Sequence, residues 1–374
     1  MLHLRGIESV VLESKSRRYC ETRVRAGVLE NGTVDLLIGA HAGERLKREA
    51  LVHRGIYLRL RGRDHHVDFP DLTGGKTIFV YAQQEVIKDL IAARISGGGR
   101  MYFEVEAVSV HHLTSPTPTI RFRTGGEDLE LHCDFIAGCD GFHGICRPSI
   151  PPGVLSVFEK VYPFAWLGIL ARAAPAKDEL VYVRHERGFS LHSMRTPEIT
   201  RLYLQCRPEE DIHEWSDDRI WQELQTRSAS DGPPLNEGPI FQKGITPMRS
   251  FVVDPMQYGN LFLLGDAAHI VPPTGAKGLN LAAADVRVFA HALDLFYRRG
   301  RKDLLDGYSA FCLRRVWQAQ RFSAWMTTML HRSEEGEFVE RIHEAELDYV
   351  ARSRSAATSL AENYVGLPFE PLPV

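Results

Sequence analysis

The spacing of apolar residues predicts a mixture of strands and helices along the whole chain. Apolar, β-branched runs at 7–13, 77–81 and 260–264 are typical of short buried strands, and 102–138 and 157–206 alternate as sheet strands do. Helical spacing marks 86–91 and 286–293, then two long stretches at about 303–331 and 335–351. Ser216 is a typical N-cap for a helix over 217–227.

The first residues read as the end of a helix that Gly6 stops, followed directly by the strand at 7–13. A strand after a helix tail implies an earlier strand of a βαβ unit. The pattern therefore predicts a mixed α/β fold in three parts. An α/β part (1–156) precedes a sheet-rich part (157–270) and a helical part (271–374).

Composition and charge exclude several classes of function. The chain has 374 residues, a net charge of −3 and a pI near 6.6, so we expect no nucleic-acid surface. No apolar run is long enough to span a bilayer, and no signal peptide is present, so we expect a cytoplasmic protein with no membrane partner. The six cysteines are scattered without a CxxC pair, and we expect no metal site.

The strongest local signal for chemistry lies at 261–280. An apolar strand delivers Gly265 and Asp266 to its carboxyl end, which is where ligands bind in open α/β sheets. Asp266 can accept hydrogen bonds from ribitol hydroxyls. The following loop carries two prolines and two glycines and opens a helix near Asn280, whose free N–H groups favour an anion such as a reduced flavin ring.

Three weaker signals leave alternatives open. Glu13 ends a strand where an acid often binds a ribose diol, although many strands end in Glu. Arg23 and Arg25 suit a pyrophosphate or are a solvent-facing pair. A set of polar residues near a turn at Pro197 suits a carboxylate clamp or a polar outer face of a sheet. That set comprises Ser193, Arg195, Arg201 and Tyr203, with Tyr182 one strand earlier.

These segments together resemble the 4-hydroxybenzoate 3-monooxygenase family of class A flavoprotein hydroxylases. The resemblance runs from Met1 to the C-terminus, and long loops take part in it. Its most specific runs are 23–30, 135–144, 263–280, 325–331 and 361–370. The family implies an FAD-binding Rossmann-like domain for the first part, a substrate-binding sheet domain, and a flavin-loop and helical interface domain.

The resemblance also implies which residues contact the cofactors. It assigns FAD contacts to Glu13, Arg25, Gln83, Asp266, Leu279 and Asn280. It assigns contacts with the nicotinamide cofactor to Arg23, His143 and Arg249, with 14–20 at its adenosine end. Ser14 stands where NADPH-using members have a basic residue, but Lys15, Arg17 and Arg18 are close by. We therefore expect NADPH and keep NADH as the alternative.

For the substrate, the resemblance implies a clamp for the carboxylate of 4-hydroxybenzoate, formed by Ser193, Arg195 and Tyr203. Tyr182 and Tyr364 would take the phenolic proton towards His53. Pro273 and Thr274 would lie beside the reacting ring, Arg201 and Lys277 would govern the position and reduction of the flavin, and Asn280 would contact its ring. The implied reaction uses NAD(P)H and O₂, passes through a flavin C4a-hydroperoxide and gives 3,4-dihydroxybenzoate, in a homodimer.

The sequence departs from the family at its start. The family begins with a strand and a Gly-x-Gly-x-x-Gly loop that holds the FAD pyrophosphate, and no such loop occurs here. A downstream start or a fragment would explain this, and so would a truncated protein with weak FAD binding; we favour the first. Two other functions stay open: a remnant that binds aromatic acids without FAD, and a nicotinamide dehydrogenase without flavin.

Overall fold

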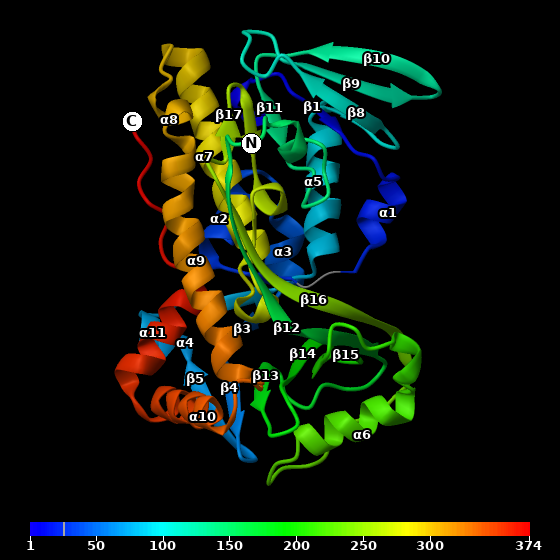
Figure 1. Ribbon diagram of the computed structural model, residues 1–374, viewed down its shortest axis with the longest axis vertical. Helices are drawn as coiled ribbons and strands as arrows, with labels where there is room; N and C mark the ends of the chain where they lie inside the picture. Colours follow the sequence, from blue (N-terminus) through cyan, green and yellow to red (C-terminus); the bar gives the residue numbers. More distant parts are fainter. Residues whose placement is uncertain (25–26) are drawn as a thin grey trace.

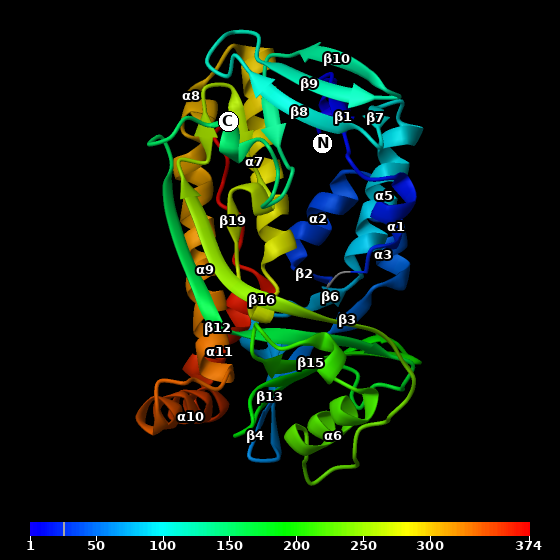
Figure 2. The same ribbon diagram turned by 45° about the vertical axis from the view of Figure 1, so that its right-hand side comes forward.

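The computed structural model describes residues 1–24 and 27–374. Figure 1 shows an elongated molecule whose upper part carries both termini and whose lower part is built around a large sheet. Two long strands, β12 (Ser156–Ala171) and β16 (Ile240–Asp254), pair antiparallel and run from one part into the other, which is clearest in Figure 2. The α/β fold predicted from the sequence is confirmed.

The upper part holds four small sheets. Strand β1 pairs with β7, β9 lies between β8 and β10, β18 lies between β11 and β17, and β6 lies between β2 and β3. The strands are β1 (Val10–Leu12), β2 (Val28–Leu29), β3 (Leu51–His53), β6 (Ile78–Val80), β7 (Arg100–Tyr102), β8 (Glu106–His111), β9 (Thr119–Thr124), β10 (Glu127–His132), β11 (Ile136–Gly138), β17 (Gln257–Tyr258) and β18 (Leu261–Leu263). The helices are η1 (His3–Arg5), α1 (Arg17–Thr22), α2 (Asn31–Gly39), α3 (Glu44–Glu49), α5 (Gln83–Ser96), η2 (Arg147–Ser149), η4 (Gly265–Ala267), α7 (Gly278–Arg299) and α8 (Asp303–Asp306).

The lower part is an eight-stranded sheet in the order β19-β16-β12-β15-β14-β13-β4-β5. Its remaining members are β4 (Gly55–Leu60), β5 (Arg63–Asp68), β13 (Leu180–Arg184), β14 (Ser190–Thr196), β15 (Ile199–Cys206) and β19 (His269–Ile270). Strand β15 alternates buried and half-buried residues along its whole length, as a strand with two different faces should. Leu202 and Leu204 pack against α6 (Asp217–Arg227), which follows η3 (Ile212–Glu214), so Arg201 and Tyr203 point to the opposite face.

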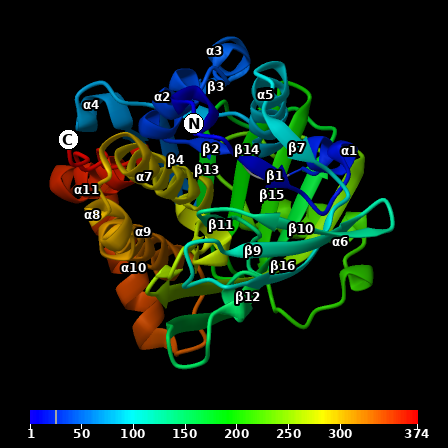
Figure 3. The same cartoon turned by 90° about the horizontal axis from the view of Figure 1, so that it is seen from above.

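The C-terminal helices cover that opposite face. They are α9 (Tyr308–Leu330), α10 (Glu337–Arg352) and α11 (Arg354–Val365), with α4 (Phe69–Thr73) beside α11 and η5 (Pro273–Gly275) beside α9. Seen from above, α7 to α11 gather on one side of the molecule and the strands on the other (Figure 3). Their apolar side chains and those of the sheet form one buried cluster, which contains Tyr182 and Tyr364. The core of the lower part therefore lies directly behind the predicted site.

Several local predictions are confirmed. Gly6 ends η1 with φ 72°, and the Ser216 hydroxyl caps α6 by accepting from the Arg219 backbone N–H. The helix predicted over 303–331 is divided into α8 and α9 at Gly307, a residue with a low helix propensity. In the described part of the chain, none of the helices is apolar over a length sufficient to cross a bilayer.

Candidate active site

One face of the sheet carries a row of four residues on neighbouring strands. Tyr182 on β13 pairs with Leu191 on β14, Leu191 pairs with Tyr203 on β15, and Tyr203 pairs with Gly168 on β12. Directly paired residues share a face, so all four belong to the side covered by the C-terminal helices. A Cβ atom at Gly168 would lie 3.3 Å from the Tyr203 ring, so glycine leaves room for that ring. The pleat thus brings Tyr182 and Tyr203 to one surface.

Two arginines lie beside this row. Ser193 pairs directly with Arg201, and Arg195 lies at an irregularity of β14 between Met194 and Thr196, where Tyr203 and Arg201 act on its charge. Burial lowers the pKa of Arg195 to about 10. Arg195 Nε and Arg201 Nε and Nη1 are buried donors without a protein acceptor. Guanidinium groups do not lose their charge in proteins, so this surface is built to receive an anion that accepts from them.

Tyr182 and Tyr364 meet in the buried core between β13 and α11. Their hydroxyl oxygens are 2.5 Å apart, and the Tyr182 hydroxyl also donates to the Thr274 carbonyl oxygen at 3.1 Å. Both phenols are nearly inaccessible, and burial raises the pKa of each above the ordinary value for tyrosine. The structure therefore joins two residues that are 182 positions apart by a direct hydrogen bond between their hydroxyls.

His53, the predicted far end of that path, is buried in β3. Burial lowers its pKa, although Glu179 and Asp178 oppose the shift. Both ring nitrogens lack a hydrogen-bond partner, and within residues 1–24 and 27–374 no contact joins His53 to Tyr364. The place of His53 in a relay stays a prediction.

The loop before α7 is fixed by a buried network of charges. Lys277 Nζ donates to Glu30 Oε1 at 2.6 Å and to the Tyr364 carbonyl oxygen at 3.0 Å. Arg315 Nη2 reaches the other Glu30 oxygen at 3.1 Å. Burial lowers the pKa of Lys277, while the Glu30 carboxylate opposes this effect. Asn280 completes the network, because its amide accepts from the Glu30 backbone N–H at 3.0 Å and donates to the Ala276 carbonyl at 2.9 Å.

The turn that carries Asp266 is held from below by a buried pair. Asp285 on α7 accepts from the Gly265 backbone N–H at 2.9 Å and contacts His269 Nε2 at 2.7 Å. Burial lowers the pKa of His269, but the charge and hydrogen bond of Asp285 outweigh it and leave the pKa raised. Gly265 has φ 60°, which a residue with a side chain adopts only with strain. Asp266 itself remains exposed, so its carboxylate is free to accept from a ligand.

The residues around this turn fit FAD. No side chain caps the N-terminus of α7, whose first N–H groups belong to Gly278, Leu279 and Asn280. The N-terminus of a long helix carries partial positive charge and attracts anions, and a reduced flavin ring is an anion. Gly278 also has open space where a Cβ atom would be, so a ligand can approach the backbone there. Gln83 begins α5, whose N-terminus also has no side-chain cap. Uncapped helix starts and an exposed acid are a suitable donor and acceptor set for the ring and ribitol chain.

Glu13 lies just after β1, where its carboxylate is half-buried. Its Oε1 accepts from the backbone N–H of Lys15 at 2.8 Å, which holds the side chain at the strand end. Within the segment 14–20, the Ser16 hydroxyl caps α1. Arg25, the other residue predicted at this end of FAD, lies outside the described residues. The structure thus leaves Glu13 well placed for a diol and says nothing of Arg25.

Phe142 brings together two of the three residues predicted for the nicotinamide cofactor. The His143 ring stands edge-on to Phe142 with centroids 5.0 Å apart, and the Arg249 guanidinium lies 4.8 Å from the Phe142 centroid. Arg23 is exposed after α1, and no contact among the described residues joins it to the other two. Their common role stays a prediction.

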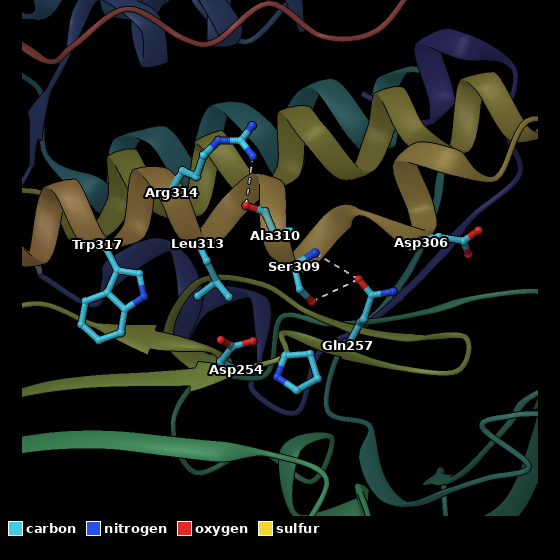
Figure 4. A pocket seen from close by; sticks show the side chains of 9 residues that line it. Asp254, Gln257, Asp306, Ser309, Ala310, Leu313, Arg314 and Trp317 are labelled. Atoms are coloured by element: carbon cyan, nitrogen blue, oxygen red, sulfur yellow. Dashed lines mark hydrogen bonds between the residues drawn. The ribbon is translucent and has the colours of Figure 1, made fainter.

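A surface hollow of about 520 Å³ lies away from all of these residues (Figure 4). It is found between α9 and the turn from β16 to β17, and Asp254, Arg314 and Trp317 are among the residues that line it. Its wall is held by Gln257, which accepts from both the backbone N–H and the hydroxyl of Ser309. None of the residues predicted from the sequence lines it, so the candidate site is defined by chemistry and not by this hollow.

Sequence reasoning missed the supports of the site. Glu30, Asp285 and Thr327 hold the predicted residues in place, and no local pattern indicates them. Glu30 lies in a run that resembles the family, yet its partner Lys277 is 247 residues away. His331 ends another such run and lies buried beneath the site. Only the packing of distant segments assigns these four a structural role.

Comparison with known proteins supports the fold and a flavin site. Residues 1–323 match the family model described as FAD binding domain. The chain is 49% identical over 372 residues to the p-hydroxybenzoate hydroxylase of Acinetobacter baylyi. The aligned region covers 99% of this chain and 92% of that protein.

Solved structures agree on the fold at low sequence identity. A p-nitrophenol 4-monooxygenase from Pseudomonas putida superposes with a TM-score of 0.84 at 16% identity, covering 98% of this chain and 94% of that one. A probable FAD-dependent monooxygenase from Pseudomonas aeruginosa gives a TM-score of 0.75 at 18% identity, covering 93% and 94%. These likenesses place the fold among those of flavin-dependent monooxygenases.

Proposed function

Because this chain belongs to the FAD-binding family that includes p-hydroxybenzoate hydroxylase, we propose that it hydroxylates 4-hydroxybenzoate to 3,4-dihydroxybenzoate. The net reaction consumes one O₂ and one NAD(P)H with a proton, and it releases NAD(P)⁺ and water. FAD, when bound, supplies the transfer of two electrons from the nicotinamide and the activation of O₂. The protein supplies the orientation of the substrate, the movement of its phenolic proton and the exclusion of water.

The observation that carries the proposal is a pair of half-buried arginines with buried N–H groups beside the sheet face that bears Tyr182. Arg195 and Arg201 offer three buried N–H groups that no protein atom accepts. A carboxylate satisfies such donors, and the planar fork of Arg195 matches its two oxygens. The hydroxyl of Tyr182 lies on that face, so it suits the opposite, phenolic end of one flat aromatic acid. Ser193 and Tyr203 complete the proposed clamp.

The proposed role of the tyrosines is to move the phenolic proton. Tyr182 accepts the proton from the substrate oxygen, and Tyr364, whose oxygen lies 2.5 Å away, passes it on towards the region of His53. The phenolate that remains is a stronger nucleophile at the carbon ortho to its oxygen. With the carboxylate fixed at Arg195, that carbon is presented to the flavin side of the site, beside Pro273 and Thr274. Arg201 and Lys277 would supply positive charge to bound FAD.

NADPH is the proposed electron donor, and NADH is the alternative. Lys15, Arg17 and Arg18 lie around α1, where they could contact a 2′-phosphate. His143 and Arg249 would contact the cofactor next to Phe142. A cytoplasmic location is part of the proposal, and all six cysteines are free thiols, as a reducing compartment requires.

An FAD titration of the purified chain, followed at the flavin absorption band, tests the proposal. We expect FAD to bind and 4-hydroxybenzoate to change the flavin spectrum, because the substrate would lie against the ring. We also expect 4-hydroxybenzoate to stimulate NADPH oxidation and 3,4-dihydroxybenzoate to accumulate. A colourless protein that still binds 4-hydroxybenzoate would instead identify an aromatic-acid binder without FAD, and NADPH oxidation without added FAD would identify a flavin-free dehydrogenase.

A homodimer is the proposed assembly, with α10 as its interface. Phe338, Ile342, Ala345 and Tyr349 follow each other at helical spacing and are all exposed, Phe338 to 78%. The first turn of α10 is acidic and its last turn carries Arg352. Two copies of α10 packed antiparallel would cover both apolar stripes and place opposite charges together.

We expect Phe338→Glu combined with Ile342→Glu to convert a dimer into a monomer, because each copy would bring two carboxylates into the apolar interface. Light scattering after size-exclusion chromatography measures the mass. Val108→Glu, at an exposed apolar position on β8, is the control and should keep the mass of the wild type. A wild-type protein with the mass of one chain would refute the assembly.

A further inference from the structure

A chain of buried hydrogen bonds connects the tyrosine pair to the interior of the lower part. It runs from Tyr182 through Thr274 and Thr327 to His331 and Trp166. Thr274 and Thr327 are fully buried, and His331 is 1% exposed. None of these contacts involves a charged group, so the position of each hydrogen atom decides which group donates and which accepts in this series of hydrogen bonds.

The single hydroxyl hydrogen of Thr327 sets the direction of the first link. Thr327 Oγ1 lies 2.7 Å from the Ser323 carbonyl oxygen, which can only accept, and 2.8 Å from Thr274 Oγ1. The Thr327 hydroxyl donates to Thr274 Oγ1, and the Ser323 carbonyl oxygen is its second acceptor. The Thr274 side chain is thus held by an oxygen of α9 whose own orientation is fixed by the helix backbone.

The lower links keep that turn of α9 in one place. His331 Nδ1 contacts the Thr327 carbonyl oxygen at 2.8 Å, and the Trp166 indole N–H donates to His331 Nε2 at 2.6 Å. Because indole only donates and a carbonyl only accepts, both bonds are satisfied only by a neutral His331 with its hydrogen on Nδ1. Burial lowers the pKa of His331 to about 3, and Phe164 and Phe189 stack on its ring. Thr327 is therefore a rigid support.

At the upper end, Tyr182 also has only one hydrogen to give. In the structure it points to the Thr274 carbonyl oxygen at 3.1 Å, so the Tyr364 hydroxyl donates to the Tyr182 oxygen. A phenol bound at Tyr182 donates to the Tyr182 oxygen while the Tyr182 hydrogen stays on Thr274. A phenolate needs that hydrogen for itself. The Thr274 carbonyl therefore competes with the substrate oxygen for one hydrogen.

We propose that Thr327 is a positioning residue: through its hydrogen bond with the Thr274 side chain, it holds the Thr274 carbonyl where it competes with the substrate oxygen for the Tyr182 hydrogen. The proposal rests on the proposed function, because it concerns a phenol bound at Tyr182. The proposal gives α9 a role in the reaction: the helix would influence how readily the bound phenol ionises, although it does not contact the substrate.

Other ionisable groups also face the tyrosine pair and set the background of any titration. Tyr203 lies on the same sheet face as Tyr182, and its charge, if ionised, would raise the pKa of Tyr182. Lys277 Nζ lies 5.8 Å from the Tyr364 ring centroid and is paired with Glu30, and Arg195 lies further along β14. None of these groups contacts Thr327, so substitutions there leave them in place.

Thr327→Val tests the proposal, because valine keeps the shape of threonine and removes the hydroxyl oxygen that bonds to Thr274. Thr327→Ser keeps that oxygen. Thr328→Val makes the same chemical change at an exposed position one residue further along α9 and serves as the matched control. The measurement is an ultraviolet titration of 4-hydroxybenzoate bound to the FAD-loaded protein, in which the phenolate band reports the ionised fraction.

We expect the pKa of the bound phenol to fall in Thr327→Val by about half a unit to one unit, the effect of one weakened hydrogen bond. Serine at 327 and valine at 328 should leave it at the wild-type value. Thr274→Val removes the same hydrogen bond from its other end and should lower the pKa of the bound phenol by a similar amount. This variant replaces Thr327→Val in the test if Thr327→Val does not fold. In the double variant the two effects should not add.

An unchanged pKa in folded Thr327→Val or Thr274→Val would overturn the proposal, and so would an equal change in Thr328→Val. A fall that Thr327→Ser shares would likewise refute it, since that variant retains the hydroxyl that bonds to Thr274. Failure of the proposed function looks different. In that case the wild-type protein would bind no 4-hydroxybenzoate, or the bound phenol would titrate as it does in free solution in every variant.

Discussion

Replacing Arg195 with glutamine is expected to weaken 4-hydroxybenzoate binding by about a hundredfold to a few thousandfold. The substitution would leave the substrate carboxylate buried without its charged partner, and breaking such a pair typically costs about 3–5 kcal/mol, with each 1.4 kcal/mol equal to about a factor of ten. Arg195 is half-buried overall, but its Nε is fully enclosed and has no acceptor in the protein. The dissociation constant is measured from the change of the flavin spectrum on titration with substrate.

Two companion variants sharpen this test. Arg195→Lys keeps a positive charge but loses the planar fork, so its affinity should lie between those of the wild type and Arg195→Gln. Arg207→Gln removes an exposed arginine just beyond β15 and should bind as the wild type does. Wild-type affinity in Arg195→Gln would mean that the carboxylate lies elsewhere and that the proposed orientation of the substrate is wrong.

Replacing Tyr182 with phenylalanine is expected to slow hydroxylation by about a hundredfold to ten-thousandfold, the range that proton transfer by a positioned side chain contributes. The variant lacks the oxygen that would take the phenolic proton, so the bound substrate would remain a weakly nucleophilic phenol. Binding of the carboxylate at Arg195 should persist, and NADPH oxidation should continue with little product. Product formed per NADPH consumed, measured by chromatography, separates this loss of coupling from a general loss of activity.

Tyr364→Phe should show a smaller effect in the same direction, because it interrupts the relay one step beyond the substrate. Tyr297→Phe is the matched control, since that phenol is 46% exposed on α7 and donates to Asp134. Hydroxylation at the wild-type rate in Tyr182→Phe would show that the phenolic proton leaves by another route.

The predictions at Tyr182 and at Thr327 examine one network from its two ends. Removing the Tyr182 hydroxyl abolishes the hydrogen for which the substrate and Thr274 compete, whereas removing the Thr327 oxygen only shifts that competition. If both hold, the tyrosine pair conducts the proton and α9 sets the ease with which it leaves the substrate.

The division of the chain at 156 and 270 remains a prediction. Strands β4 and β5, at 55–68, come from the first predicted part and lie at one edge of the sheet formed mostly by the second. Short-range patterns could place both strands but not the sheet that they join, because pairing between distant strands depends on which faces the rest of the chain must bury.

The sequence by itself determined the features that neighbouring residues encode. The N-cap at Ser216, the stop at Gly6, and the strand and loop at 261–280 follow from hydrogen bonds and backbone preferences within a few residues. Strand pairing places Ser193 and Arg201 on one face, but the shared parity of Ser193 and Arg195 does not decide the face of Arg195, because the register of β14 shifts between Met194 and Thr196. The pairing of Tyr182 with Tyr364 came only from resemblance to the family.

Only the tertiary structure decided which distant groups support the site. Lys277 meets Glu30 across 247 positions, and Thr274 meets Thr327 across 53. These contacts require α7, α9 and the sheet to pack in one arrangement, which a local pattern cannot specify. The charges and hydrogen-bond directions follow from the same packing, because burial removes the water that would otherwise satisfy each group and leaves it only protein partners.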